Sequence, residues 1–177
     1  MIEVEVKARV NDPKHAERSI IALGASPIGI EAQADTYYSA LYRDFGKTDE
    51  ALRIRVQDNK YFFTYKGPKM DSVSKTRKEY EVEVNDADVL GNILSSLGFV
   101  PVATIVKRRK KYRLGDFLIS LDEVRNLGDF MEIEVPIRDS KFHEEKVESI
   151  FRLFEKLGIE REASIRKSYL EMILEKS

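Results

Sequence analysis

Charged residues of one sign occur in pairs separated by a single residue in several alternating segments of the chain. Residues i and i+2 of an extended strand point to the same face. Each pair would therefore place two like charges side by side on one face of a strand. The acidic pairs are Glu3–Glu5, Glu81–Glu83 and Glu132–Glu134, and the basic pairs are Arg53–Arg55 and Lys107–Arg109.

These pairs suit two complementary kinds of chemistry. Guanidinium forks and lysine ammonium groups bind phosphate oxygens. Clustered carboxylates suit Mg²⁺ or Mn²⁺, which are hard ions that prefer oxygen ligands. A polyphosphate with its divalent cation would satisfy both sets together. His15 and His143 fall in helix-like segments, and we expect them on the surface rather than among metal ligands.

An ordinary solvent-exposed sheet face is the competing interpretation of any single alternating strand. The choice depends on what covers the apolar face. Leu52, Ile54 and Val56 alternate with charged residues and need a second layer. If helices supply that layer outside a closed sheet, the charged faces point inward. A charged interior is costly to desolvate unless it is wet and binds a ligand.

Period-two alternation predicts eight strands that would position these pairs. Asp58-Asn59, Gly115 and the segment 126–128 predict tight turns between some of them, and the Gly, Pro and Ser content of 67–75 predicts a loop. The face of the strand that carries Glu81 and Glu83 is left unassigned. The predicted strands are 2–10, 28–40, 51–57, 60–67, 76–84, 99–114, 116–124 and 129–138.

Helix-like segments follow three of the acidic strands and stop at a Leu-Gly. They span 12–24, 86–98 and 139–158, and a fourth, closing helix is predicted from Glu160 to Lys176. Asp12 suits an N-cap, Pro13 the first helical position and Gly24 the C-terminal stop. Short connections between strands imply antiparallel pairing. We therefore predict an α+β fold, an eight-stranded antiparallel closed β-barrel with helices packed outside.

Composition narrows the classes of protein. A chain of 177 residues is most simply one domain, 1–177. Cysteine is absent, which excludes disulfides and a thiol nucleophile and fits a reducing cytoplasm. The balance of 30 basic against 31 acidic residues does not indicate a nucleic-acid or membrane binder. Alternation also splits the basic run 107–111 between two faces. The high charge content leans toward a thermophilic source.

The ordered set of motifs resembles the CYTH family, also called triphosphate tunnel metalloenzymes. The N-terminal Glu3-Val-Glu5-Val-Lys7 matches its ExExK signature, and the later motifs follow in order over essentially the whole chain. The overall sequence pattern is most similar to the CyaB-type class IV adenylate cyclases. The later matching positions are Arg53, Arg55, Lys66, Lys107, Arg109, Asp122, Glu132, Glu134, Lys167 and Tyr169.

The resemblance implies a barrel that binds a triphosphate in its interior together with Mg²⁺ or Mn²⁺. The activity would be class IV adenylate cyclase, from ATP to cAMP and pyrophosphate, or hydrolysis of tripolyphosphate, thiamine triphosphate or a nucleoside triphosphate. A non-catalytic polyphosphate- or nucleotide-binding module is the alternative, and a homodimer is left open. The implied catalytic residues are Glu3, Glu5, Lys7, Glu132 and Glu134. The implied metal ligands are Glu3, Glu5, Asp122, Glu132 and Glu134. The implied phosphate contacts are Lys7, Arg53, Arg55, Lys66, Lys107, Arg109 and Lys167.

Overall fold

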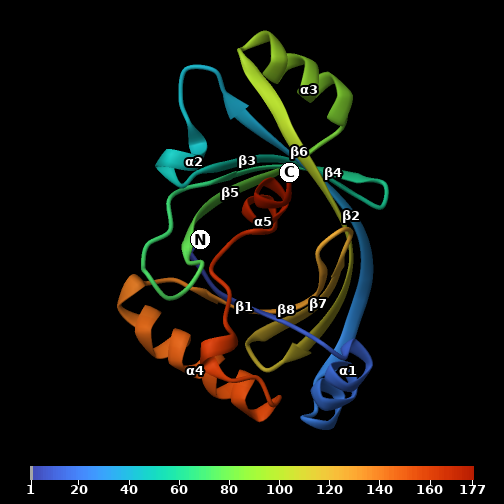
Figure 1. Ribbon diagram of the computed structural model, residues 1–177, viewed down its shortest axis with the longest axis vertical. Helices are drawn as coiled ribbons and strands as arrows, with labels where there is room; N and C mark the ends of the chain where they lie inside the picture. Colours follow the sequence, from blue (N-terminus) through green and yellow to red (C-terminus); the bar gives the residue numbers. More distant parts are fainter. Residues whose placement is uncertain (1) are drawn as a thin grey trace.

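Eight antiparallel strands close into a barrel in the computed structural model, which describes residues 2–177 (Figure 1). Their order around the barrel is β1-β5-β4-β3-β2-β6-β7-β8. The predicted α+β barrel is therefore confirmed. The strands are β1 Ile2–Arg9, β2 Ser26–Ala40, β3 Ala51–Gln57, β4 Lys60–Lys66, β5 Arg77–Val84, β6 Phe99–Leu114, β7 Phe117–Val124 and β8 Gly128–Ile137.

Helices α1, α3 and α4 lie outside the barrel wall, and α5 lies across one end of the barrel (Figure 1). The helices are α1 Pro13–Ala22, α2 Phe45–Thr48, α3 Ala87–Ser96, α4 His143–Lys156 and α5 Tyr169–Lys176, with 3₁₀ turns at Ser140–Phe142 and Arg161–Ala163. Asp12 and Asp86 accept hydrogen bonds from the first turns of α1 and α3, as N-caps do. Gly24 has a φ of 94° and ends the first of these helices, as predicted.

The alternation of β1 separates the hydrophobic core from the barrel interior. Val4, Val6 and Ala8 are almost fully buried on the outer face of β1, beneath α1 and α4. Glu3 and Glu5 lie on the opposite face and line the interior. Each large apolar side chain that is fully buried stabilises the fold by about 1.5–3 kcal/mol. The apolar faces of the strands therefore fix the charged faces inward.

The barrel has a weak seam where β1 meets β5. Only Ile2 and Glu3 pair with β5 there, whereas all eight residues of β1 pair with β8. The chain fills the open edge with other segments. Lys75 N donates to the carbonyl of Glu5 at 2.9 Å, and Ile165 N donates to the carbonyl of Lys7 at 2.7 Å.

This seam explains why the closing helix begins later in the chain than we predicted. We predicted helix from Glu160, but α5 begins at Tyr169. Residues 164–165 run beside β1 because its unpaired backbone groups there need partners. Ser168 then starts α5 with a capping box to Glu171.

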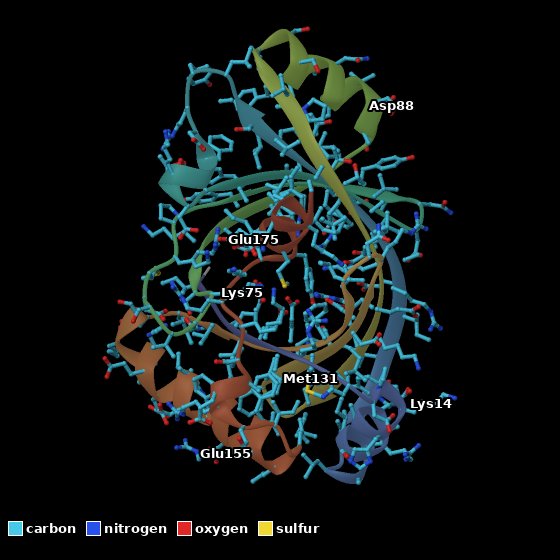
Figure 2. All side chains as sticks on the ribbon, in the orientation of Figure 1. Lys14, Lys75, Asp88, Met131, Glu155 and Glu175 are labelled. Carbon is cyan, nitrogen blue, oxygen red and sulfur yellow. The ribbon has the colours of Figure 1, made fainter. Side chains whose placement is uncertain are left out.

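Charged side chains divide between the barrel and its surroundings (Figure 2). Lys75 points into the barrel, whereas Lys14, Asp88 and Glu155 lie on the outer helices. His15 is exposed, as expected. His143 differs from expectation because it is half-buried, with Nε2 2.9 Å from a carboxylate oxygen of Asp71. No helix in residues 2–177 combines the length and the hydropathy that a membrane span requires.

Candidate active site in the barrel interior

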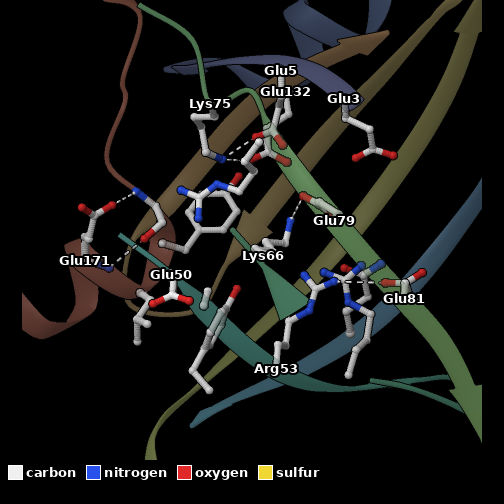
Figure 3. Close-up of a pocket in the computed structure, with 18 of the residues that line it drawn as sticks. Glu3, Glu5, Glu50, Arg53, Lys66, Lys75, Glu79, Glu81, Glu132 and Glu171 are labelled. Atoms are coloured by element: carbon white, nitrogen blue, oxygen red, sulfur yellow. Dashed lines mark hydrogen bonds and ion pairs between the residues drawn. The ribbon is translucent and has the colours of Figure 1, made fainter. Parts of the chain in front are cut away.

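A cavity of about 840 Å³ occupies the barrel interior. All eight strands and α5 contribute to its lining, and more than half of the lining residues are charged. Such a wall is stable only if the charges are paired or solvated. Most of these charges are held in ion pairs, some of which are drawn in Figure 3.

Asp35 organises the basic side chains of β3. Arg55 donates to it through two parallel hydrogen bonds of 2.7 and 2.8 Å. Arg53 Nη1 lies 3.6 Å from the same carboxylate, and Arg53 Nη2 donates to Thr64 at 3.0 Å. Burial alone would raise the pKa of Asp35, but Arg53, Arg55 and Lys107 lower it far below its usual range. Asp35 is therefore ionised and holds two guanidinium groups against the cavity.

Asp122 has the corresponding role on β7, which is separated from β2 by β6 alone. It accepts two hydrogen bonds from Arg109, at 2.7 and 2.5 Å, and one from the Tyr169 hydroxyl at 2.8 Å. Glu132 accepts a further bond from Arg109. Lys107 Nζ lies 3.7 Å from Asp122 and 3.9 Å from Asp35. This lysine therefore lies between the two carboxylates that hold the arginines.

The cavity also places cations next to carboxylates on strands far apart in sequence (Figure 3). Lys75 donates to Glu5 and, at 3.2 Å, to Glu132. Lys66 donates to Glu79 at 2.5 Å. In each of these contacts a positive charge is offset by a neighbouring carboxylate.

Glu3, Glu5 and Glu134 form an acidic patch on β1 and β8. Glu5 and Glu134 are directly opposite in the antiparallel register. Burial, followed by repulsion from Glu5 and Glu3, raises the pKa of Glu134 to about 8. Burial and Glu79 also raise the pKa of Glu3. Oxygen ligands that repel one another suit a divalent cation.

The acidic patch fits a hard divalent cation by the chemistry of its donors. As the side chains lie, no three or more Asp, Glu or His residues within 2–177 converge closely enough to ligate a metal ion. Binding by Glu3, Glu5 and Glu134 therefore requires rotation of these glutamate side chains. Glu132 and Asp122 already accept hydrogen bonds from basic side chains, and so does Glu5, from which a cation would have to displace Lys75.

Several predicted residues line the cavity, and three do not. Lys7 is completely buried beneath the Tyr169 ring, with Nζ 4.1 Å from the ring centroid, and it donates to the carbonyl of Lys167. The Lys167 side chain instead pairs with Glu175 on the outside of α5. Asp122 lies behind the lining. The predicted residues that line the cavity are Glu3, Glu5, Arg53, Arg55, Lys66, Lys107, Arg109, Glu132 and Glu134.

Sequence reasoning missed Asp35, Lys75 and Glu79, which the fold brings to the cavity, and it left the face of Glu81 and Glu83 unassigned. Asp35 was missed because it is a single acidic residue of β2 and is not part of a like-charged pair at i and i+2. Lys75 sits in a loop that offers no periodicity. Glu79 and Glu81 share the inner face of β5, so a consistent alternation across 77–83 was the available signal. The exposed Glu83 lies beyond the cavity lining, 4.0 Å from Lys60.

Comparison with known proteins gives consistent similarities over the whole chain. The family model described as "CYTH domain" matches residues 1–169. "Putative adenylate cyclase MJ0240" from Methanocaldococcus jannaschii is 41% identical over 172 residues, 97% of this chain and 98% of that protein. "Adenylate cyclase CyaB" from Aeromonas hydrophila is 26% identical over 94% of this chain and 86% of its own length.

Solved structures with the same architecture include two from Pyrococcus horikoshii. The PH1819 protein has a TM-score of 0.93 and 41% identity, and the match covers 99% of each chain. The PH1012 protein has a TM-score of 0.85 and 32% identity, covering 96% of this chain and 98% of that one. The similarity therefore includes the barrel, the outer helices and the C-terminal segment together.

Proposed function

The chain belongs to the CYTH domain family, and we propose that it is an enzyme that binds a triphosphate and a divalent cation inside the barrel and cleaves a phosphoanhydride bond. One observation carries this proposal. Anchored arginine and lysine groups share a single cavity with an acidic patch that suits a hard cation. The two sets match the two components of a metal–triphosphate complex.

The basic side chains would bind phosphate oxygens with little rearrangement. Asp35 and Asp122 already fix three guanidinium groups in place. Groups held before the ligand arrives stabilise developing negative charge without a reorganisation cost at the moment of reaction. Phosphoryl transfer depends mainly on such positioning and charge stabilisation. Lys66, Lys107 and Arg109 would extend this surface along a triphosphate.

Glu3, Glu5 and Glu134 would hold the divalent cation, for which we propose Mg²⁺ or Mn²⁺. When bound, it would neutralise phosphate charge and activate the attacking oxygen. Lys75 donates to both Glu5 and Glu132, and together with Arg109 it holds the pKa of the buried Glu132 well below its usual range. Glu132 in turn holds Arg109.

Two reactions are compatible with this arrangement. In hydrolysis, a water oxygen bonds to the terminal phosphorus, the bond to the bridging oxygen breaks, diphosphate leaves and one proton is released. In cyclisation, the ribose 3′-oxygen of ATP bonds to the α-phosphorus, pyrophosphate leaves and the hydroxyl proton is released. Hydrolysis needs only the phosphate site. Cyclisation is favoured by the 41% identical relative, which carries an adenylate cyclase name.

A product assay tests the proposal and separates the two reactions. The purified protein would be given tripolyphosphate, ATP and thiamine triphosphate, each with Mg²⁺ or Mn²⁺, and phosphate, pyrophosphate and cAMP would be measured. We expect product from at least one substrate. Glu134→Gln should reduce the rate at least tenfold by weakening the cation site, while Glu123→Gln should not.

Glu123 is the matched control because it is exposed on the outer face of β7. Tight triphosphate binding without any product under all these conditions would contradict the enzyme proposal and favour a binding module. Equal rates for Glu134→Gln and Glu123→Gln would contradict the assignment of the acidic patch.

A further inference from the structure

Helix α3 presents an apolar stripe to solvent, at the opposite end of the molecule from α1 and α4 (Figure 1). Val89, Ile93 and the C-cap residue Leu97 are spaced at i, i+4 and i+8, so they follow one side of the helix. Each of these side chains is half or more exposed. Leu90 and Leu94 instead pack against the barrel wall. The stripe is therefore not the side of α3 that the fold of the single chain uses.

The surface of α3 is also poor in charge. Asp88 is the single charged residue among the ten of Ala87–Ser96, whereas α4 carries seven Asp, Glu, Lys and Arg residues among fourteen. Helices that face only water usually carry charges on their outer side. Exposed large apolar residues with few charges are typical of the central part of a protein–protein interface.

The turn after β2 enlarges the stripe. Leu41 N donates to the carbonyl of Gly98, at the end of α3, at 3.3 Å. The Tyr42 ring meets the Phe99 ring edge to face, with centroids 6.2 Å apart. Leu41 and Tyr42 are 77% and 75% exposed. We call this surface the α3 patch, and it consists of Leu41, Tyr42, Val89, Ile93 and Leu97.

The order of residues along the stripe favours a second copy of this chain as the partner. Two antiparallel α3 helices related by a twofold axis at Ile93 would place Ile93 against Ile93 of the second copy, and Val89 against Leu97. Apolar side chains thus meet at every contact. The two Asp88 residues would be about 15 Å apart along the helix axes, so no like charges face each other.

The α3 patch adjoins the cavity through a row of aromatic rings. Phe99 lies between Tyr42 and Phe45, and the Phe99 and Phe45 centroids are 6.3 Å apart. Phe45 lines the cavity. Association through the patch would therefore restrain the segment 41–45 beside the cavity.

We propose that the α3 patch is an interface between two copies of this chain, in which α3 packs antiparallel against α3 of the second copy about a twofold axis at Ile93. The inference goes beyond the proposed function and does not depend on it. Its test needs neither a substrate nor a cation.

Sedimentation analysis of the parent chain at up to roughly 100 µM should show a species of twice the mass of one chain. Ile93→Asp would place a carboxylate against its own copy in an apolar contact, and it should weaken association by at least about a hundredfold. Ser95→Asp is the matched control, because Ser95 is exposed on the other flank of the same helix. It should leave association unchanged. Circular dichroism would show that both variants are folded.

The absence of cysteine from the chain allows the position of the axis to be tested directly. Ile93→Cys would bring the sole thiol of each chain next to that of the second copy, and a short bismaleimide should link the two chains. Ser95→Cys should remain largely unlinked, because the two flanks of a helix face in different directions.

A parent chain that stays monomeric at roughly 100 µM would overturn the inference. This includes the case in which the patch binds phosphatidylcholine vesicles, because lipid would then be the occupant. A dimer that survives Ile93→Asp would use another surface and would equally contradict the proposal. So would a dimer that is linked no better through Ile93→Cys than through Ser95→Cys.

Discussion

At the scale of single residues, the interior works by fixing charges in advance. Asp35 and Asp122 are buried, ionised and each doubly bonded to one arginine. Such bidentate pairs hold a planar guanidinium more firmly than single contacts do. Lys107 differs because it lies between the two pairs without a close hydrogen bond.

The affinity for a triphosphate should fall with rising pH because of Lys107. Burial lowers the pKa of Lys107 to about 8, and repulsion from Arg109 and Arg55 adds to this shift. Attraction to Asp122 and Asp35 acts in the opposite direction. The amine is charged below pH 8 and neutral above it, whereas a bound triphosphate favours the charged form. We expect calorimetry with ATP to show about a tenfold loss of affinity between pH 7 and pH 9, with proton uptake at pH 8.5.

Lys107→Met should remove the part of this pH dependence that comes from Lys107, leave the part that comes from Glu134, whose pKa is also about 8, and bind ATP more weakly at pH 7. Arg108→Met is the control, because the adjacent Arg108 is exposed on the outer face of β6 and should leave the pH dependence intact. An unchanged pH profile in Lys107→Met would show that another group titrates.

At the scale of elements, each strand serves two layers at once. The outer face of β1 packs beneath α4 through Val4 and Val6, and its inner face carries Glu3 and Glu5. A one-residue slip would exchange these faces, so the apolar contacts specify the register. Helix α4 also holds the 67–76 loop through His143 and Asp71, and this loop delivers Lys75 to the cavity.

Phe154→Ala should destabilise the protein by about 3–5 kcal/mol, because the Phe154 ring is 2% exposed in the core under α4. The free energy of unfolding would be measured by urea denaturation. Phe142→Ala, just before the same helix, should change it by less than about 1 kcal/mol because that ring is 45% exposed. ATP affinity below the unfolding transition should be similar in both variants. A large effect of Phe142 alone would contradict this description of the core.

At the scale of the whole molecule, stability and ligand binding occupy different regions. The largest hydrophobic core lies between the barrel wall and the outer helices α1 and α4. The cavity lies inside the wall and is lined mainly by paired charges. Site residues can therefore exchange partners or bind a cation without disturbing the layer that dominates folding.

Chelation should consequently stop turnover without unfolding the protein. In EDTA we expect product formation to fall to background, while the free energy of unfolding changes by less than about 1 kcal/mol. Tripolyphosphate at 100 times its dissociation constant should raise that free energy by about 2.7 kcal/mol. Circular dichroism during urea denaturation would measure both effects. Loss of the folded state in EDTA would instead indicate a structural metal.

The sequence by itself determined the strands and most of the inward-facing charges. Alternation in β1, β3 and β6 sets which residues share a face, since strand geometry has a period of two. Once helices were assigned to the apolar faces, Arg53 and Lys107 had to point inward. Capping residues such as Asp12 marked helix starts by local hydrogen bonding. These features depend on neighbours close in sequence.

Only the tertiary structure decided which charged side chains meet in the cavity. The open edge of β1 takes up residues 164–165, which shortens the closing helix and places Tyr169 over Lys7, between it and the cavity. Lys75 reaches Glu5 from a loop, and Gln33 meets Gln57 across two strands. Such contacts depend on barrel closure and strand register, which bring together residues that the sequence keeps far apart.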